Sequence, residues 1–170
     1  MWTRRQRQMC IRDSLLVGGV DNSGGAGILA DKETLVTLGS GAAVAVTAIT
    51  VQSDDRFHDS HSVPAVILEK QLNSINLDEI GAIKIGMLPH SDSIEVLVEF
   101  LTESRTIPVV LDPVFSSSSG GELCSQNAFE SLISLLLPLV SLTTPNLSEA
   151  LRLTDSQSEN SQDPVRLANE

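Results

Sequence analysis

A glycine-rich turn, GGVDNSGGAGILAD (residues 18–31), joins an apolar segment to a predicted helix. Such a turn leaves no side chains in front of the first backbone N–H groups of the helix, so a flat or anionic ligand can lie close to the backbone. The spacing of Gly24, Gly25 and Gly27 is not the G-x-G-x-x-G of dinucleotide-binding folds, and no Gly-Lys-Ser/Thr follows as in a P-loop. The turn predicts a ligand site but does not say whether the ligand is a nucleotide.

Asp31 is a second residue of this stretch that could do chemistry. On a helical wheel it falls between Leu35 and Leu38, inside the apolar stripe that Ile28 begins. A carboxylate on an inward face costs desolvation energy unless it is paired or hydrogen-bonded. The alternative explanation is the helix dipole, which stabilises an acid near a helix N-terminus by roughly 0.3–1 kcal/mol. Because the dipole does not account for the inward face, we favour a ligand contact.

Apolar, β-branched segments alternate with helical patterns along the rest of the chain. Strands are predicted at residues 14–20, 42–52, 80–88, 107–114 and 139–146, and helices at residues 25–39, 63–75, 91–104, 126–138 and 147–154. The polar stretch 53–62 is predicted as a loop. This alternation indicates an α/β domain with a mostly parallel central sheet and helices on both faces.

Candidate ligand-binding residues gather at the carboxyl ends of these strands, where open parallel sheets bind their ligands. They are Gly19, Asp21, Gln52, Gly86, Met87, Asp112, Val114, Thr144, Asn146 and Glu149. Polar loops begin where strands end in any α/β protein, so position alone is a weak signal. Asp112 is the more unusual of them, because it lies inside the apolar segment VVLDPV.

The composition narrows the class of partner. The chain has 11 basic and 22 acidic residues among 170, a formal net charge of −11, which disfavours binding to nucleic acid. The longest apolar run, AAVAVTAITV, is too short to span a membrane. Cys10 and Cys124 form neither a metal-binding spacing nor a disulfide framework. We therefore expect a cytoplasmic protein with no membrane partner.

The two ends of the chain differ from its middle. Residues 1–13 contain several arginines without an apolar period, and residues 4–13 match, codon by codon, the in-frame translation of a transposase-type sequencing adapter. We interpret them as a non-native segment and residues 14–170 as the N-terminal part of a single domain. Asp163 and Pro164 begin a helical pattern that nothing terminates, so we expect a fragment.

Five motifs occur together and in a fixed order: GGVDNSGGAGILAD, AITVQ, KIGML, VVLDPV and TPNLSEA. In this combination the chain resembles the hydroxymethylpyrimidine/phosphomethylpyrimidine kinases of thiamine biosynthesis, which have a ribokinase-like fold. The resemblance covers residues 15–170 and implies a three-layer α/β/α sandwich whose C-terminal part is missing. It also implies ATP and Mg²⁺ as cofactors and a small pyrimidine alcohol as substrate. A homodimer is a further candidate partner.

Carried over position by position, the resemblance assigns roles to the candidate residues. Gly19 and Asp31 would lie at the pyrimidine pocket, Gln52 would read the hydrogen-bonding edge of the ring, and Met87 and Val114 would form apolar walls. Asp112, Asn146 and Glu149 would lie near the phosphates of ATP, with Asp112 and Glu149 as Mg²⁺ ligands. This division suits the chemistry, because a planar ring needs apolar walls and phosphoryl transfer needs metal-binding carboxylates. The glycine-rich turn would then receive the alcohol, and ATP would bind further along the sheet.

Departures from the family pattern leave alternatives open. The family usually has proline at Asn22, alanine at Gly18 and an apolar residue at Thr50, which affects substrate preference more than fold. The family's catalytic base and Gly-Thr-Gly anion hole would lie beyond residue 170, so we expect no catalytic residue in this chain and an inactive fragment. A pyridoxal kinase of the same fold and a non-catalytic ligand-binding fragment are the alternatives. Gln52 and Met87 favour a pyrimidine over pyridoxal.

Overall fold

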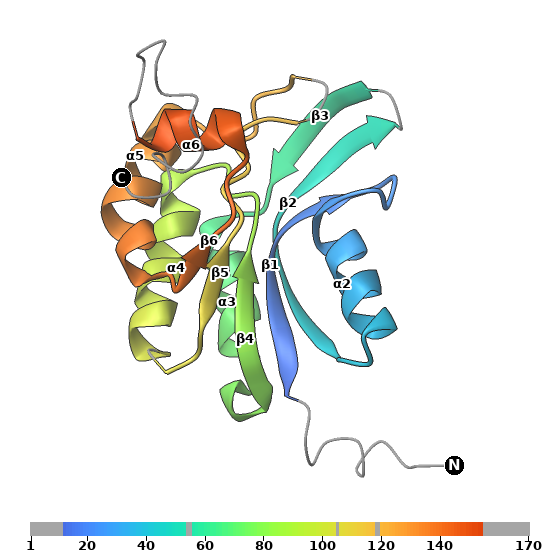
Figure 1. The fold of residues 1–170 in the computed structure, drawn as a ribbon, viewed down its shortest axis with the longest axis vertical. Helices are drawn as coiled ribbons and strands as arrows, with labels where there is room; N and C mark the ends of the chain where they lie inside the picture. The colour runs from blue at the N-terminus through green and yellow to red at the C-terminus, as the bar shows by residue number, and fades with distance from the viewer. Residues whose placement is uncertain (1–11, 54–55, 105, 118–119, 155–170) are drawn as a thin grey trace.

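The computed structural model describes residues 12–53, 56–104, 106–117 and 120–154. At its centre is a six-stranded sheet with the order β3-β2-β1-β4-β5-β6 (Figure 1). The strands are β1 (Asp13–Asp21), β2 (Ala42–Ser53), β3 (Arg56–Ser62), β4 (Ile80–Ile85), β5 (Val109–Leu111) and β6 (Leu142–Thr143). All neighbouring strands run parallel except β2 and β3. The predicted α/β fold with a mostly parallel sheet is confirmed.

Helices cover both faces of the sheet unequally (Figure 1). Helix α2 (Gly27–Thr37) lies on one face, beside β1 and β2, and α3 (Ala65–Asn73), α4 (Ser91–Glu103) and α5 (Gln126–Ser131) lie on the other. A π-helical turn (Leu132–Leu136) and a 3-10 turn (Leu137–Leu139) continue α5, a 3-10 turn (Leu77–Glu79) precedes β4, and α6 (Leu147–Leu153) follows β6. Within the described ranges, no helix is both long and apolar enough to cross a membrane.

Most of the predicted non-native segment, residues 1–13, lies outside the described residues. Residues 1–11 and the helical pattern that begins at Asp163 are not among them. We predicted Asp13 as the last residue of the N-terminal segment, but it is the first residue of β1 and pairs with Ile80 of β4. The strand therefore begins one residue before the predicted domain boundary.

The prediction of a loop over residues 53–62 is wrong, because most of this stretch is the antiparallel edge strand β3. Its side chains alternate between exposed and half-buried positions, and its charged residues face solvent. The strand is held by backbone pairing with β2 rather than by an apolar face, with Phe57 as its one large apolar side chain. Polar residues of this kind are typical of edge strands, and they hide the strand from any search for an apolar period.

The core lies between the sheet and helices α3, α4 and α5. Its fully buried side chains include Leu15 of β1, Ile83 of β4, Leu97 of α4 and Leu111 of β5. Helix α2 contributes much less, because Ile28 is its only buried residue. Leu38, which the wheel placed on the same apolar stripe as Asp31, is 74% exposed and lies just after the helix. The inward stripe of α2 is therefore shorter than predicted.

A register shift in β2 helps to place the pocket described below. Gly18 pairs with Val46 and Gly19 with Ala48, which leaves Thr47 as the extra residue of a bulge. The buried Thr47 hydroxyl donates a hydrogen bond of 2.6 Å to the carbonyl oxygen of Met87. Bulges of this kind redirect side chains near functional sites. Here the bulge ties β2 to the loop that follows β4.

Candidate active site

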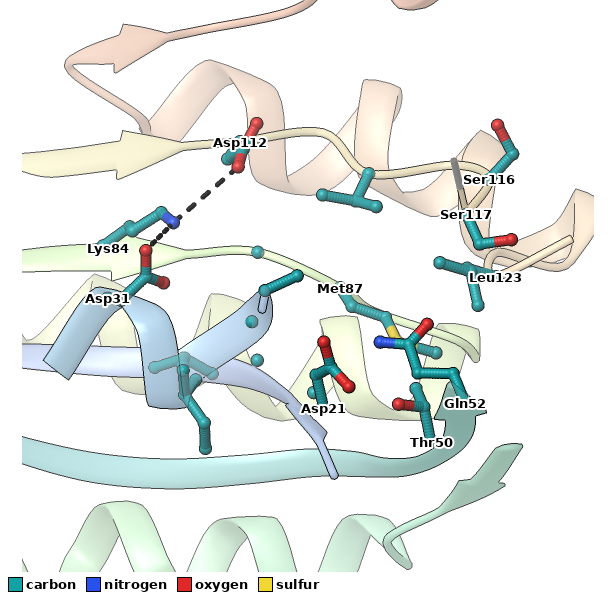
Figure 2. Close-up of a pocket in the computed structure, with 18 residues that line it drawn as sticks. Asp21, Asp31, Thr50, Gln52, Lys84, Met87, Asp112, Ser116, Ser117 and Leu123 are labelled. Atoms are coloured by element: carbon teal, nitrogen blue, oxygen red, sulfur yellow. Dashed lines mark hydrogen bonds and ion pairs between the residues drawn. The ribbon is translucent and has the colours of Figure 1, made fainter. Parts of the chain in front are cut away.

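A pocket of about 210 Å³ opens at the carboxyl ends of β1, β4 and β5, beside the N-terminus of α2. Figure 2 shows its lining side chains converging from these elements and from the end of β2. The lining residues are Val17, Gly18, Gly19, Asp21, Ala26, Gly27, Ile28, Asp31, Thr50, Gln52, Lys84, Gly86, Met87, Asp112, Val114, Ser116, Ser117 and Leu123. Open parallel sheets bind ligands at this edge, as the sequence led us to expect.

The pocket brings together most of the predicted site residues but not all of them. Gly19, Asp31, Gln52, Met87, Asp112 and Val114 line it. Asn146 and Glu149 do not line it and instead form the N-terminal cap of α6. The predicted site thus divides into a pocket and a separate helix end.

The glycines of the turn are required by close backbone approach. A Cβ atom on Gly19 would lie 2.8 Å from the sulfur of Met87, so the bare glycine lets Met87 reach the pocket wall. Gly27 has a φ of +61°, and a Cβ there would collide with the carbonyl oxygen of Gly19. A left-handed residue with no room for a side chain must be glycine. The turn is therefore folded tightly against the end of β1.

Asp21 is the buried carboxylate of the pocket, with 4% of its surface exposed. Both the backbone N–H and the hydroxyl of Ser23 donate to its Oδ1 at 2.8 Å, and the Ser23 hydroxyl also lies 2.9 Å from Oδ2. Burial alone would raise the pKa of Asp21, but these hydrogen bonds outweigh burial and lower it. Asp21 is thus an anion held by neutral donors.

An ion cluster forms the opposite end of the pocket. The Lys84 ammonium lies 2.5 Å from Asp31 Oδ1 and 3.7 Å from Asp112 Oδ2, and Figure 2 marks both contacts. The three side chains come from β4, α2 and the segment after β5, and each is between a quarter and about a third exposed. Asp31 therefore faces the pocket as a member of an ion pair. The attraction to Lys84 offsets the free energy that desolvation of the Asp31 carboxylate costs. With one cation and two carboxylates, the cluster keeps a net negative charge.

Several lining residues were given no role by the sequence reasoning. Lys84 is the one charged residue in the predicted strand 80–88, and that isolated charge in an apolar segment was a usable signal. Asp21 was a candidate at the end of its strand but was assigned no role. Thr50 was noted only as a departure from the family pattern, and its hydroxyl donates to the Val20 carbonyl oxygen at 3.2 Å. Ser116, Ser117 and Leu123 belong to a loop whose return to the pocket no local pattern predicts.

Asn146 and Glu149 form a capping box at the start of α6. The Asn146 side chain accepts from the Glu149 backbone N–H at 3.0 Å, and the Glu149 carboxylate accepts from the Asn146 backbone N–H at 2.8 Å. This reciprocal pair satisfies two N–H groups that the helix would otherwise leave free. A structural role thus accounts for both residue types at this spacing, and the predicted role near phosphate stays a prediction.

Arg152 fixes α6 against the rest of the molecule. Its guanidinium lies 4.4 Å from the ring centre of Phe129 on α5 and 5.0 Å from that of Phe115, just beyond the pocket loop. The two rings contact each other edge to face at 5.1 Å. Cation–π contacts of this geometry hold a short helix that has no buried residue of its own.

Cys124 lies in an environment that makes its thiol inert. The thiol is buried, and burial, opposed by the charge of Arg152 and assisted by that of Glu122, raises the thiol pKa to about 11. A thiol with that pKa stays protonated near neutral pH and is a poor nucleophile. Among the described residues, no group of three His, Cys, Asp or Glu side chains could by itself hold a metal ion.

Comparison with known proteins now adds to this geometry. Residues 21–170 match the phosphomethylpyrimidine kinase family. A hydroxymethylpyrimidine/phosphomethylpyrimidine kinase from Aquifex aeolicus is 40% identical over 138 residues, covering 81% of this chain and 54% of that protein. The chain spans about half the length of the curated relatives that it matches.

Solved structures show the same fold. The crystal structure of phosphomethylpyrimidine kinase from Clostridium difficile 630 superposes with a TM-score of 0.83 at 34% identity, covering 93% of this chain and 69% of that one. A pyridoxal kinase from Staphylococcus aureus, solved with AMP-PCP and pyridoxal, superposes with a TM-score of 0.78 at 33% identity, covering 93% and 56%. The predicted ribokinase-like fold is confirmed. This chain belongs to the phosphomethylpyrimidine kinase family.

Proposed function

We propose that the protein containing this chain uses ATP to phosphorylate the hydroxymethyl group of 4-amino-5-hydroxymethyl-2-methylpyrimidine and then its monophosphate, in thiamine biosynthesis. One observation carries this proposal: a small pocket has apolar walls at Met87 and Val114, a bare backbone at Gly19 and a single amide, Gln52, at its edge. A planar nitrogen ring needs this combination of flat walls and one polar edge. Family membership supports the same substrate class.

The charged end of the pocket suits the reacting phosphates. Lys84 is a cation within the pocket, beside Asp112 at the carboxyl end of β5. A partly exposed lysine can stabilise negative charge that develops on a transferred phosphoryl group. The structure of the S. aureus relative with AMP-PCP supports ATP as the phosphoryl donor.

Two carboxylates offer donor chemistry that fits Mg²⁺: Asp112 in the pocket and Glu149 at the start of α6, outside it. Asp112 is 35% exposed, and Glu149 uses one carboxylate oxygen in the α6 cap, so each has an oxygen available. Mg²⁺ is held in kinases by one or two carboxylates together with substrate phosphates and water. We therefore propose that Asp112 and Glu149 hold the ion, which would neutralise phosphate charge.

Two alternatives remain candidates. A pyridoxal kinase would use the same fold, as the S. aureus relative does, but Gln52 and Met87 favour the pyrimidine. A ligand-binding chain without catalysis would keep the pocket and lack turnover. The free, buried thiol of Cys124 supports a cytoplasmic location, since such compartments keep thiols reduced.

Calorimetry and a kinase assay test the proposed function. This chain should bind the aminopyrimidine alcohol in preference to pyridoxal, and the complete open reading frame should form its phosphate from ATP, detected by mass spectrometry. Gln52→Ala should weaken binding roughly tenfold, because the polar edge of the ring loses its partner. Gln126→Ala, at an exposed position on α5, is the matched control and should leave affinity unchanged. Tighter binding of pyridoxal would favour the alternative kinase instead.

A further inference from the structure

Thr47 is a fully buried polar residue that has no part in the function proposed so far. It is the extra residue of the bulge in β2, and its hydroxyl donates to the Met87 carbonyl oxygen at 2.6 Å. In the sheet β1 lies between β2 and β4, so this bond reaches across β1 to the segment that follows β4. The Thr47 carbonyl oxygen accepts from the Val63 N–H at 2.8 Å, just after β3. Thr47 therefore joins three separate parts of the chain.

Met87 is the pocket residue that the Thr47 hydroxyl holds. Figure 2 shows its side chain pointing from the segment after β4 into the pocket. The side chain is 7% exposed and packs in a small apolar cluster with Ala48, Phe57, Val114 and Leu123. A methionine side chain is unbranched and adapts easily to its surroundings. A fixed wall at this position therefore depends on a fixed backbone.

Hydrogen bonds hold the backbone of the segment after β4 at three points. The Gly86 N–H donates to the Val17 carbonyl oxygen at 2.8 Å. The Ser125 N–H donates to the Pro89 carbonyl oxygen at 3.0 Å. The third bond is the one from the Thr47 hydroxyl, between these two points. Of the three, it alone comes from a side chain, so it alone depends on the residue type of its donor.

The Met87 side chain is limited on another side by the end of β1. It rests on the bare backbone of Gly19, where a Cβ would lie 2.8 Å from the Met87 sulfur. Exchanging the Thr47 hydroxyl for a methyl group would put carbon against the Met87 carbonyl oxygen. Such a contact needs about 3.3–3.6 Å, whereas the hydrogen bond spans 2.6 Å. Because the carbonyl would also lose its donor, the Met87 backbone would have to move.

We propose that Thr47 is a positioning residue, which acts through Met87 to fix one apolar wall of the pocket and so limits the size of the ring that the pocket accepts. This inference rests on the proposed function and adds a physical basis for selectivity by size. A fixed wall rejects a ring with one additional methylene, whereas a wall that yields accommodates it. One methylene in an apolar pocket is worth roughly 10–200-fold in discrimination.

The test compares rings that differ by one methylene. Calorimetry would measure the affinity of this chain for 4-amino-5-hydroxymethyl-2-methylpyrimidine and for two homologues, the 2-ethyl ring and the 4-methylamino ring. Wild type should prefer the parent ring to at least one homologue by roughly tenfold or more. In Thr47→Val that preference should fall at least roughly threefold, the effect of losing one neutral hydrogen bond. An unchanged or stronger preference would overturn the inference.

Two further variants separate position from stability. Thr47→Ser keeps the hydroxyl and should keep the wild-type preference. Ser104→Ala is the matched control, because the Ser104 hydroxyl is also buried and donates to a carbonyl oxygen, that of Phe100, at 2.9 Å, but the residue does not line the pocket. It should leave the preference unchanged even where it lowers the free energy of unfolding. A collapse of the preference in Ser104→Ala would show that loss of stability, rather than the position of Met87, sets the selectivity.

A double variant shows whether Thr47 acts through Met87. Met87→Ala removes the wall and should abolish the preference, and adding Thr47→Val should change it no further. A further change in the double variant would contradict the inference. If wild type binds the parent ring and rejects neither homologue, selectivity by size fails while the proposed function survives. If wild type does not bind the parent ring, the proposed function fails and the inference fails with it.

The link between the two residues is also measured without a ligand. The ε-methyl NMR signal of Met87, identified by its absence from Met87→Leu, should shift in Thr47→Val because the Met87 backbone moves. It should keep its wild-type position in Thr47→Ser and in Ser104→Ala. A signal that does not move in Thr47→Val would overturn the inference whichever ring binds.

A measurement on wild type covers the case in which Thr47→Val does not fold. The Thr47 hydroxyl proton should exchange slowly with solvent, because the residue is fully buried and the proton is bonded to the Met87 carbonyl oxygen. The Thr34 hydroxyl, which donates to the Ala30 carbonyl oxygen at an exposed position on α2, provides the reference for rapid exchange. Equally rapid exchange at Thr47 would contradict the inference without any variant.

Discussion

At one end of the pocket Asp21 is 4% exposed and is held by neutral donors, while at the other end the carboxylates of Asp31 and Asp112 are 25% and 35% exposed and share Lys84. Hydrogen bonds from neutral donors have directions, so the first arrangement fixes where these donors point. The ion pairs of the second arrangement depend mainly on distance and remain partly solvated. The first end is therefore suited to recognise the shape and hydrogen-bonding pattern of a ring. The second is suited to exchange partners when a charged phosphate arrives.

The largest effect should come from the tight turn at the hydrogen-bonded end. Gly27→Ala should lower the free energy of unfolding by about 3 kcal/mol, because the residue is left-handed and its Cβ would collide with the Gly19 carbonyl oxygen. Gly24→Ala is the matched control, since its φ of +81° is also left-handed but nothing lies within 4 Å of its Cβ. It should cost only about 1 kcal/mol. Equal losses in urea denaturation would mean that backbone strain alone matters.

Removing the cation from the charged end of the pocket should destabilise the fold less than Gly27→Ala does. Lys84→Met leaves Asp31 and Asp112 without their cation and should destabilise the fold by about 1–2 kcal/mol, less than for a fully buried pair because all three groups are partly solvated. Lys70→Met, at an exposed position on α3, should stay within about 0.5 kcal/mol of wild type. Urea denaturation of both variants measures the difference. A Lys84 variant as stable as wild type would show that the cluster contributes no net stability.

The α6 cap tests whether the charged end extends beyond the pocket. Asn146→Ala should cost about 1 kcal/mol of stability through loss of the cap. Glu149→Gln should cost almost nothing, because glutamine still accepts from the Asn146 N–H. If Glu149 holds Mg²⁺ as proposed, the same variant in the complete protein should lower kcat at least roughly tenfold. Normal kcat together with normal stability would assign Glu149 to the cap alone.

The same contrast explains what the sequence could predict. Gly19, Gln52, Met87, Asp112 and Val114 were found because they end strands, and parallel strands bring their carboxyl ends to one edge whatever the details of packing. Asp31 was found by its helical position, although the stripe that suggested it ends early and its actual partner is Lys84. Position along the chain predicts which residues reach the pocket.

What could not be predicted are contacts between distant elements. The pairing of Asp31 with Lys84 joins residues that are 53 positions apart, and no local pattern indicates which cation a carboxylate will meet. The edge strand β3 was missed because backbone pairing, not an apolar face, forms it. Asn146 and Glu149 show the opposite limit, since the family resemblance implied a role near phosphate for two residues whose types and spacing are also those of a capping box.

The smallest of the four effects should be the pH dependence of the stability that Asp21 contributes at the hydrogen-bonded end of the pocket. The hydrogen bonds that Asp21 accepts lower its pKa below the ordinary value of 3.8, so the folded state binds its proton more weakly than the unfolded state does. Asp21 should then contribute stability that is fully present at pH 6 and is lost as the pH falls below 3.8 through the folded value. The stability advantage of wild type over Asp21→Asn, measured by urea denaturation at pH 6 and at pH 3, should therefore shrink toward the lower pH. An advantage that instead grows on acidification would mean that burial, rather than hydrogen bonding, dominates at Asp21. In that case the folded chain would bind the Asp21 proton more readily than the unfolded chain, and this end of the pocket would not be built around an anion.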